Sequence, residues 1–98
     1  MSPVGLNVAE SWASVLAGKS GISTITHFDA SAFPVRIAGT LKGFEASRYV
    51  PPKDVKKMDP FIHYGIAAAV EAVTDSGLEI TEANAERVGV AIGSGIGG

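Results

Sequence analysis

The sequence contains no cysteine, which narrows the chemistry that its 98 residues can perform. Without thiols the chain has no disulfides, no thiolate metal ligands and no cysteine nucleophile. No apolar run reaches the roughly 18 residues needed to span a membrane. No Lys or Arg precedes Lys19 to mark a signal peptide. We therefore expect a soluble, cytoplasmic protein without a membrane partner.

An excess of positive charge is also lacking. Eight Lys and Arg against ten Asp and Glu give a formal net charge of -2, whereas domains that bind nucleic acid are usually strongly basic. Nucleic acid is therefore not an expected partner. No His, Asp or Glu lies three or four residues after His63, a spacing that would form a helical pair of metal ligands. We predict neither a metal nor a cofactor.

The chain does contain many apolar residues. Hydrophobic residues make up 46% and charged residues 18%, which is typical of one globular domain rather than a disordered segment. A first helix is predicted over residues 8–16, because Asn7 and Glu10 resemble a capping box and Gly18 is a natural end. Its apolar residues share one face, on which Trp12 is expected to be part of the core.

A second helix is predicted from Pro60 to about Ser76, with Asp59 as its N-cap and Gly77 at its end. Its apolar residues lie on several faces, which is typical of a buried helix. We expect His63 to lie at the edge of the core rather than to bind a ligand.

The residues between these helices carry weaker signals. Residues 19–34 are rich in Gly, Ser and Thr, and we predict a long ordered loop there. His27 beside Asp29 could serve as a general base, but no second chemical partner is visible, so a structural role is favoured. A short strand is predicted over residues 35–41.

Four of the eight basic residues are concentrated before the second helix: Arg48, Lys53, Lys56 and Lys57. Pro51-Pro52 starts a turn or a short helix, and a helix would place Lys53, Lys56 and Lys57 on one side. A basic face of this kind attracts a phosphate or an acidic protein surface. A plain solvated face is the alternative, and the residues by themselves favour neither.

The last stretch, residues 87–98, begins as an apolar run rich in Val and Ile and ends as a glycine-rich loop. The run predicts a buried strand of a parallel sheet covered by helices, and hence an α/β fold class. Two strands cannot cover a helix that is apolar all round. We therefore expect residues 1–98 to be part of one larger domain, truncated at both ends.

The glycine-rich end has a second interpretation. Gly93, Gly95 and Gly98 satisfy G-x-G-x-x-G after a strand, the fingerprint of a dinucleotide-binding loop. The match is weak, because the confirming helix and acidic residue would lie beyond Gly98. A Walker loop is excluded by the lack of Gly-Lys-Ser/Thr. A nucleotide-binding oxidoreductase is thus one alternative hypothesis, and a non-enzymatic interaction domain that uses the basic face is another.

Several separate motifs resemble one family, in order and with near-matching spacing over essentially the whole chain. They are Ser2-Pro3-Val4-Gly5, Leu16-Ala17-Gly18-Lys19-Ser20-Gly21-Ile22, Lys57-Met58-Asp59, and the stretch from Asp75-Ser76-Gly77-Leu78 to Gly93-Ser94-Gly95-Ile96-Gly97-Gly98. Together they resemble the N-terminal quarter of the β-ketoacyl-acyl carrier protein synthase II family. This family comprises the elongating condensing enzymes of dissociated fatty acid synthesis.

The resemblance implies a thiolase-like fold, in which two similar α/β halves form a layered αβαβα core, and a homodimer. The implied reaction is a decarboxylative Claisen condensation between an acyl group on an active-site Cys and malonyl-acyl carrier protein. The family's Cys and its two catalytic His lie downstream of the matched region, and His27 and His63 do not correspond to them. No catalytic residue is therefore assigned here, and the chain is expected to be inactive alone.

Two groups of residues match functional positions of the family. Lys53, Lys56 and Lys57 match basic positions that dock the acidic acyl carrier protein. Gly95 and Ile96 match the loop that lines the acyl-chain pocket, where the volume of a β-branched side chain would limit the usable chain length. These five residues are the predicted site.

Overall fold

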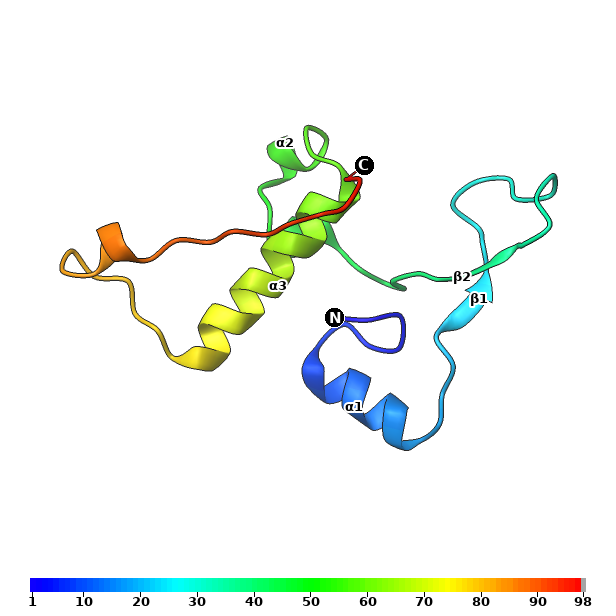
Figure 1. The fold of residues 1–98 in the computed structure, drawn as a ribbon, viewed down its shortest axis with the longest axis horizontal. Helices are drawn as coiled ribbons and strands as arrows, with labels where there is room; N and C mark the ends of the chain where they lie inside the picture. Colours follow the sequence, from blue (N-terminus) through cyan, green and yellow to red (C-terminus); the bar gives the residue numbers. More distant parts are fainter. Residues whose placement is uncertain (98) are drawn as a thin grey trace. The chain divides into compact units, whose positions relative to one another are not determined.

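The computed structural model describes residues 1–97 and divides the chain into two units, residues 1–44 and residues 45–98. Unit 1 contains one helix and a small sheet, and unit 2 contains two helices and two 3-10 turns (Figure 1). In chain order the elements are α1 (Val8–Leu16), β1 (Ile22–Thr24), β2 (Ile37–Gly39), η1 (Ala46–Arg48), α2 (Pro52–Val55), α3 (Pro60–Ser76) and η2 (Ala85–Arg87).

Helix α1 begins where the sequence predicts. The side-chain oxygen of Asn7 accepts a hydrogen bond from the backbone N–H of Glu10 at 2.8 Å. The Glu10 carboxylate accepts in return from the backbone N–H of Leu6 at 2.9 Å, one residue earlier than in an ideal capping box. These bonds satisfy two backbone N–H groups and fix the start of the helix.

The end of α1 is equally well defined. Gly18 has φ +64°, and its N–H donates to the carbonyl of Val15 at 3.0 Å. The N–H of Lys19 donates to the carbonyl of Ser14 at 2.9 Å. This pair of bonds is the Schellman arrangement, which confirms Gly18 as the residue that ends the helix.

The apolar face of α1 is not buried. Trp12 is 61% exposed, and Val8, Val15 and Leu16 are also exposed. The prediction that Trp12 belongs to a core is therefore wrong for the residues described, because unit 1 leaves this face open.

Strands β1 and β2 pair antiparallel, with Ser23 opposite Ala38 at the centre of the register. Strand β2 lies within the predicted strand 35–41. The prediction of a long loop over residues 19–34 is wrong where β1 forms. A strand of three residues, with Gly, Ser and Thr around it, is too short to show an alternating apolar pattern. A hydrogen bond from the N–H of Ile25 to the carbonyl of Arg36 extends the pairing by one step.

In unit 2 the prolines lie where helices start. Pro52 and Pro60 each occupy the beginning of a helix, α2 and α3, as predicted. Helix α3 ends at Gly77, which has φ +66°. Asp59 precedes α3 in an extended conformation, but its side chain makes no capping hydrogen bond.

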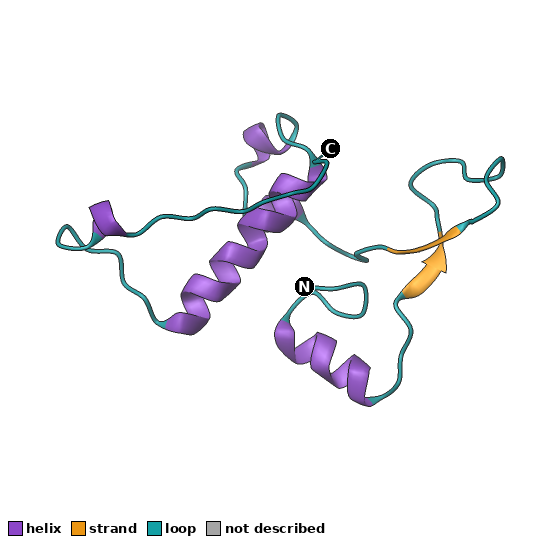
Figure 2. Ribbon diagram, viewed as in Figure 1, coloured by secondary structure: helices purple, strands orange, loops and turns teal. Residues whose placement is uncertain are grey.

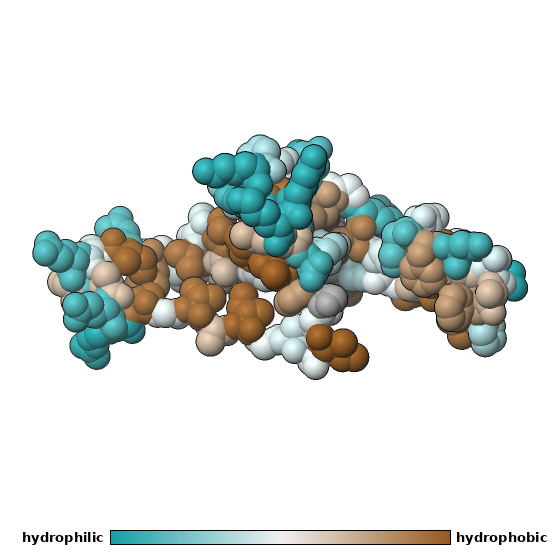
Figure 3. Space-filling view, turned by 90° about the horizontal axis from the view of Figure 1, so that it is seen from above, coloured by the Kyte–Doolittle hydropathy of each residue, from teal (hydrophilic) through white to brown (hydrophobic). Residues whose placement is uncertain are grey.

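Only one face of α3 is covered. His63 and Ala67, four residues apart, are buried, whereas Phe61, Ile62, Tyr64, Val70 and Val73 are exposed. The prediction of a helix buried all round is thus wrong for the described residues, because unit 2 supplies cover for a single stripe. Apolar side chains are open to the surface in the space-filling view (Figure 3).

The strand predicted for the apolar run that begins residues 87–98 is not formed within the described part of the chain (Figure 2). Val88 has the extended angles φ -113° and ψ 123°, but a strand requires a hydrogen-bonded neighbour and residues 1–97 supply none. Val90 and Ile92 are accordingly exposed. Of the residues in the glycine-rich end, Gly98 lies outside the described residues.

This extended segment nevertheless follows α3. A Cβ added to Gly65 would lie 3.4 Å from Ile92 Cδ1, and one added to Gly97 would lie 3.5 Å from Phe61 Cζ. Because higher numbers in the segment meet lower numbers in the helix, the two run antiparallel along the N-terminal half of α3 (Figure 1). A helix followed by an extended segment that returns along it is the local arrangement of an α/β fold.

Candidate functional site

The predicted docking lysines lie on and directly after α2. Lys53 is part of the helix, Lys56 is its C-cap, Lys57 follows, and all three are exposed. Lys57 Nζ pairs with Asp54 Oδ1 at 2.9 Å. Within residues 1–97 no carboxylate forms an ion pair with Lys53 or Lys56. Of the three lysines, these two therefore carry a charge that no neighbouring carboxylate offsets.

Helix α2 ends at Val55, earlier than a single helical face carrying all three lysines would require. The chain continues as a turn, in which the N–H of Lys57 donates to the carbonyl of Asp54 at 2.9 Å. The lysines therefore belong to a helix and the turn after it, and the orientation of that turn determines where two of them lie.

His63 of α3 connects this turn to the rest of unit 2. Its Nε2 lies 3.1 Å from the carbonyl oxygen of Val55, and the residue is only 7% exposed. This burial agrees with the expectation that His63 lies at the edge of the core. The sequence gives no signal for the hydrogen bond itself, because its two partners lie eight residues apart across a turn.

The glycine-rich end forms a bend. The N–H of Gly97 donates to the Ser94 hydroxyl oxygen at 3.2 Å, and Gly97 has φ +84°. Gly95 and Ile96 lie between these residues, and the Ile96 side chain is fully exposed. The described residues do not enclose an acyl pocket around Ile96, so its role as a pocket residue stays a prediction.

Helix α3 brings the two predicted groups to the same end of unit 2. Gly97 lies against the Phe61 ring, and the Val55 carbonyl is hydrogen-bonded to the His63 ring. Positions 61 and 63 are about 200° apart around a helix. The lysine-bearing turn and the glycine-rich bend therefore meet the first turns of α3 from different sides (Figure 1).

His27 and Asp29 do not form a catalytic pair. Asp29 Oδ1 accepts a hydrogen bond from the backbone N–H of Ser31 at 2.9 Å. Hydrogen bonds from the backbone and then the side chain of Ser31 lower the pKa of Asp29. The His27 ring instead lies edge-on to Phe28, with 4.9 Å between the ring centroids. The arrangement fits the structural role that the sequence favours.

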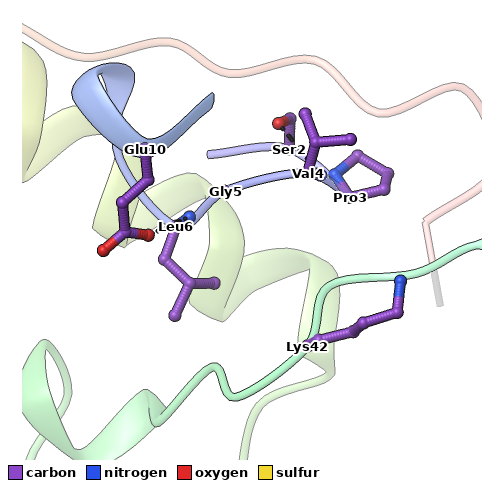
Figure 4. A pocket seen from close by; sticks show the side chains of 7 residues that line it. All are labelled: Ser2, Pro3, Val4, Gly5, Leu6, Glu10 and Lys42. Carbon is purple, nitrogen blue, oxygen red and sulfur yellow. Dashed lines mark hydrogen bonds between the residues drawn. The ribbon is translucent and has the colours of Figure 1, made fainter. Parts of the chain in front are cut away.

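Unit 1 contains a hollow of 270 Å³ that the sequence does not reveal (Figure 4). Its walls come from the loop before α1, from Glu10 and from Lys42. Both charged groups are already engaged, since Glu10 accepts from the N–H of Leu6 and Lys42 Nζ donates to the carbonyl of Gly21 at 2.9 Å. The hollow therefore offers no charged group that is poised for a reaction.

Two further classes of site find no support in residues 1–97. No three His, Asp or Glu side chains lie close enough to hold a metal ion together. Among the described helices, none combines the length and apolar character that crossing a membrane demands.

Comparison with known proteins shows that the sequence motifs and the local fold point to the same family. Residues 1–98 match the family described as "Beta-ketoacyl synthase, N-terminal domain", and the chain belongs to this family. The match does not favour the nucleotide-binding or interaction-domain hypotheses.

Relatives named "3-oxoacyl-[acyl-carrier-protein] synthase 2" match the whole chain. The protein of Vibrio cholerae serotype O1 is 58% identical over 98 residues, that of Vibrio harveyi 60% and that of Staphylococcus aureus 45%. In each case the match covers 100% of this chain and 24% of the relative. The chain thus spans about a quarter of the length of these curated relatives.

A solved structure extends the likeness to three dimensions. "The ishigamide ketosynthase/chain length factor" is 38% identical to this chain, with a TM-score of 0.67. The match covers 80% of this chain and 19% of that one. The described helices and small sheet are therefore a partial α/β piece of a ketosynthase fold.

Proposed function

We propose that residues 1–98 form the N-terminal quarter of a 3-oxoacyl-[acyl-carrier-protein] synthase of type II, an acyltransferase that elongates fatty acyl chains. The proposal rests on one observation. Relatives of that name match the chain over its whole length at 45% to 60% identity. In this proposal the complete enzyme is a cytoplasmic homodimer with a layered αβαβα core.

The chemistry requires a nucleophile that this chain does not contain. In the proposed reaction a Cys thiolate outside residues 1–98 takes the acyl group, and the carrier protein leaves as its thiol. The malonyl thioester loses CO₂, its carbanion attacks the acyl thioester, and the Cys thiolate departs as the new carbon–carbon bond forms. Residues 1–98 would supply part of the acyl pocket and a docking surface for the carrier protein.

A chimera tests the proposal directly. Residues 1–98 would replace the matching quarter of the Vibrio cholerae relative, and 3-oxoacyl product would be measured with acyl- and malonyl-acyl carrier protein. We expect activity near that of the parent protein, with one CO₂ released for each product formed. A soluble, folded chimera without condensing activity would contradict the proposal. The same relative without its matching quarter is the negative control.

The docking role is proposed for Lys53, Lys56 and Lys57, which we call the docking lysines. Their support is the exposed position of all three and the lack of a carboxylate partner for Lys53 and Lys56 within residues 1–97. Changing all three to Glu in the chimera should raise the KM for acyl-acyl carrier protein by about tenfold or more at low salt, because charges at a docking surface control encounter. An unchanged KM at low salt would contradict the role.

A matched control separates location from net charge. Lys19→Glu, Lys42→Glu and Arg87→Glu together change the charge by the same amount at positions outside the cluster. This variant should leave the KM within about twofold of the chimera. Among single changes, Lys53→Glu and Lys56→Glu should act more strongly than Lys57→Glu, since Asp54 already offsets the charge of Lys57.

The pocket role is proposed for Gly95 and Ile96. It is supported by the family match and by the bend that projects Ile96 away from the described residues. Ile96→Phe in the chimera should shorten the longest acyl chain that is elongated, because the added volume occupies space the chain would need. Ile96→Val is the matched control and should keep or slightly lengthen the range. An unaltered range with Phe would contradict the assignment.

A further inference from the structure

His63 is the one buried polar or charged side chain among residues 1–97, and the proposed reaction gives it no role. Its ring lies 3.1 Å from the carbonyl oxygen of Val55, the last residue of α2. A carbonyl can only accept a hydrogen bond, so Nε2 must carry the proton. This holds for the corresponding neutral tautomer and also for the protonated ring.

The carbonyl of Val55 has few other partners. It lies at the end of a four-residue helix, where backbone carbonyls have no partner within the helix. The N–H of Met58 reaches it at 3.4 Å, which is longer than the 3.1 Å to His63. The His63 bond is therefore the shorter of the two and the one that comes from outside the turn.

The hydrogen bond connects the short helix α2 to the long helix α3. Helix α2 is four residues long and contains no buried residue, and a helix of this length is not stable by itself in water. Helix α3 is 17 residues long and has a defined start and end. Lys53 lies two residues before Val55 and Lys56 directly after it, so the carbonyl held by His63 lies between the two unpaired docking lysines.

We propose that His63 is a positioning residue for the docking lysines. Its Nε2–H holds the Val55 carbonyl against α3 and thereby orients Lys53 and Lys56 toward the acidic surface of the carrier protein. This inference rests on the proposed function. In this proposal His63 contacts neither the substrate nor the carrier protein. It affects how the carrier protein is recognised and leaves the condensation step unchanged.

Three substitutions in the chimera separate the hydrogen bond from the packing. His63→Leu fills the site without a donor, His63→Met does so with a more adaptable side chain, and His63→Gln restores an amide donor. We expect Leu and Met to raise the KM for acyl-acyl carrier protein about threefold to tenfold with kcat unchanged, the effect of losing one hydrogen bond. Gln should return the KM to within about twofold of the chimera.

A carrier-free substrate makes the test specific. With acyl-coenzyme A as the thioester, which lacks the acidic carrier surface, the Leu and Met variants should keep both KM and kcat. Loss of kcat with both substrates would show general damage and overturn the positioning role. His27→Leu is the matched control, because it removes the exposed His of the chain, and it should change neither parameter.

The possible failures are distinguishable. If reversal of the docking lysines raises the KM but His63→Leu and His63→Met do not, the inference about His63 is wrong and the docking role stands. If Gln fails to restore the KM, the hydrogen bond is not the cause and the inference is also wrong. If the chimera lacks condensing activity altogether, the proposed function itself fails.

Discussion

Helices α1 and α3 have similar C-terminal ends, but they differ in what covers them. Gly18 and Gly77 end them with φ +64° and φ +66°, and an Asn or Asp precedes each. Helix α1 nevertheless buries no residue, whereas α3 buries His63 and Ala67. Residues next to a helix decide where it begins and ends, while its burial depends on segments that are distant in sequence.

The close contacts of the two helices differ in kind as well. The backbone of α1 approaches the loop before it so closely that a Cβ added to Gly5 would overlap the backbone nitrogen of Ser11. Helix α3 meets the extended segment through a side chain, with 3.4 Å between a Cβ on Gly65 and Ile92 Cδ1. The contact of α1 is between backbone atoms of residues close in sequence, which cannot move aside. The contact of α3 is with a side chain far along the chain, which can change its position.

The largest expected effect comes from filling these two contacts in the chimera. Gly5→Ala should lower the stability by about 3 kcal/mol, because backbone atoms cannot move aside for the new methyl group. Gly65→Ala should be neutral or stabilising by up to about 1 kcal/mol, since Ala favours the helix and the Ile92 methyl can shift. The midpoint of thermal unfolding measures both. Equal losses would show that α3 is as tightly enclosed as the start of α1.

A second pair of substitutions compares the covered and open faces. Ala67 is 1% exposed, whereas Ala13 lies on the exposed side of α1. Ala67→Leu should cost about 2 kcal/mol through overpacking, and Ala13→Leu should change the stability by less than about 0.5 kcal/mol. Urea unfolding of the two variants provides the comparison. A tolerated Leu at position 67 would mean that the covered stripe of α3 is loosely packed.

The third comparison concerns the two glycines that end the helices. Neither Gly18 nor Gly77 has an atom within 4 Å of an added Cβ, so only the left-handed backbone opposes a side chain. Ala at either position should cost about 1 kcal/mol, and Asn should cost less because it tolerates this conformation better. Thermal unfolding of the four variants tests the equality. A clearly larger cost at one helix would indicate an additional contact there.

The features that the sequence predicts are those that depend on neighbouring residues. The start and end of both helices, and the prolines that begin α2 and α3, follow from residues within a few positions. Strand β1 and the exposure of Trp12 are not predicted by the sequence. Both depend on residues far along the chain, and no periodic pattern reports whether a partner is present.

The candidate site divides in the same way. The docking lysines and the glycine-rich end are visible in the sequence, because residue type and spacing carry the signal. The His63–Val55 bond is not, since it depends on how the turn between α2 and α3 folds back. The run of Val and Ile after residue 87 predicts a strand, but no strand forms there, because residues 1–97 supply no neighbouring strand to pair with it. Residue composition cannot reveal whether such a neighbour is present.

The smallest expected effect distinguishes the two helix starts. Asn7 accepts a hydrogen bond from Glu10 at 2.8 Å, but the Asp59 side chain makes no capping bond. Asn7→Ala should therefore cost about 1 kcal/mol, and Asp59→Ala only about 0.3 kcal/mol from the lost charge near the helix N-terminus. Asn7→Ser and Asp59→Asn, which keep a side-chain oxygen at the position, are the controls, and thermal unfolding of the chimera measures all four variants. Similar losses at both positions would show that Asp59 caps α3 in solution, and α3 would then rely on its own start as much as α1 does.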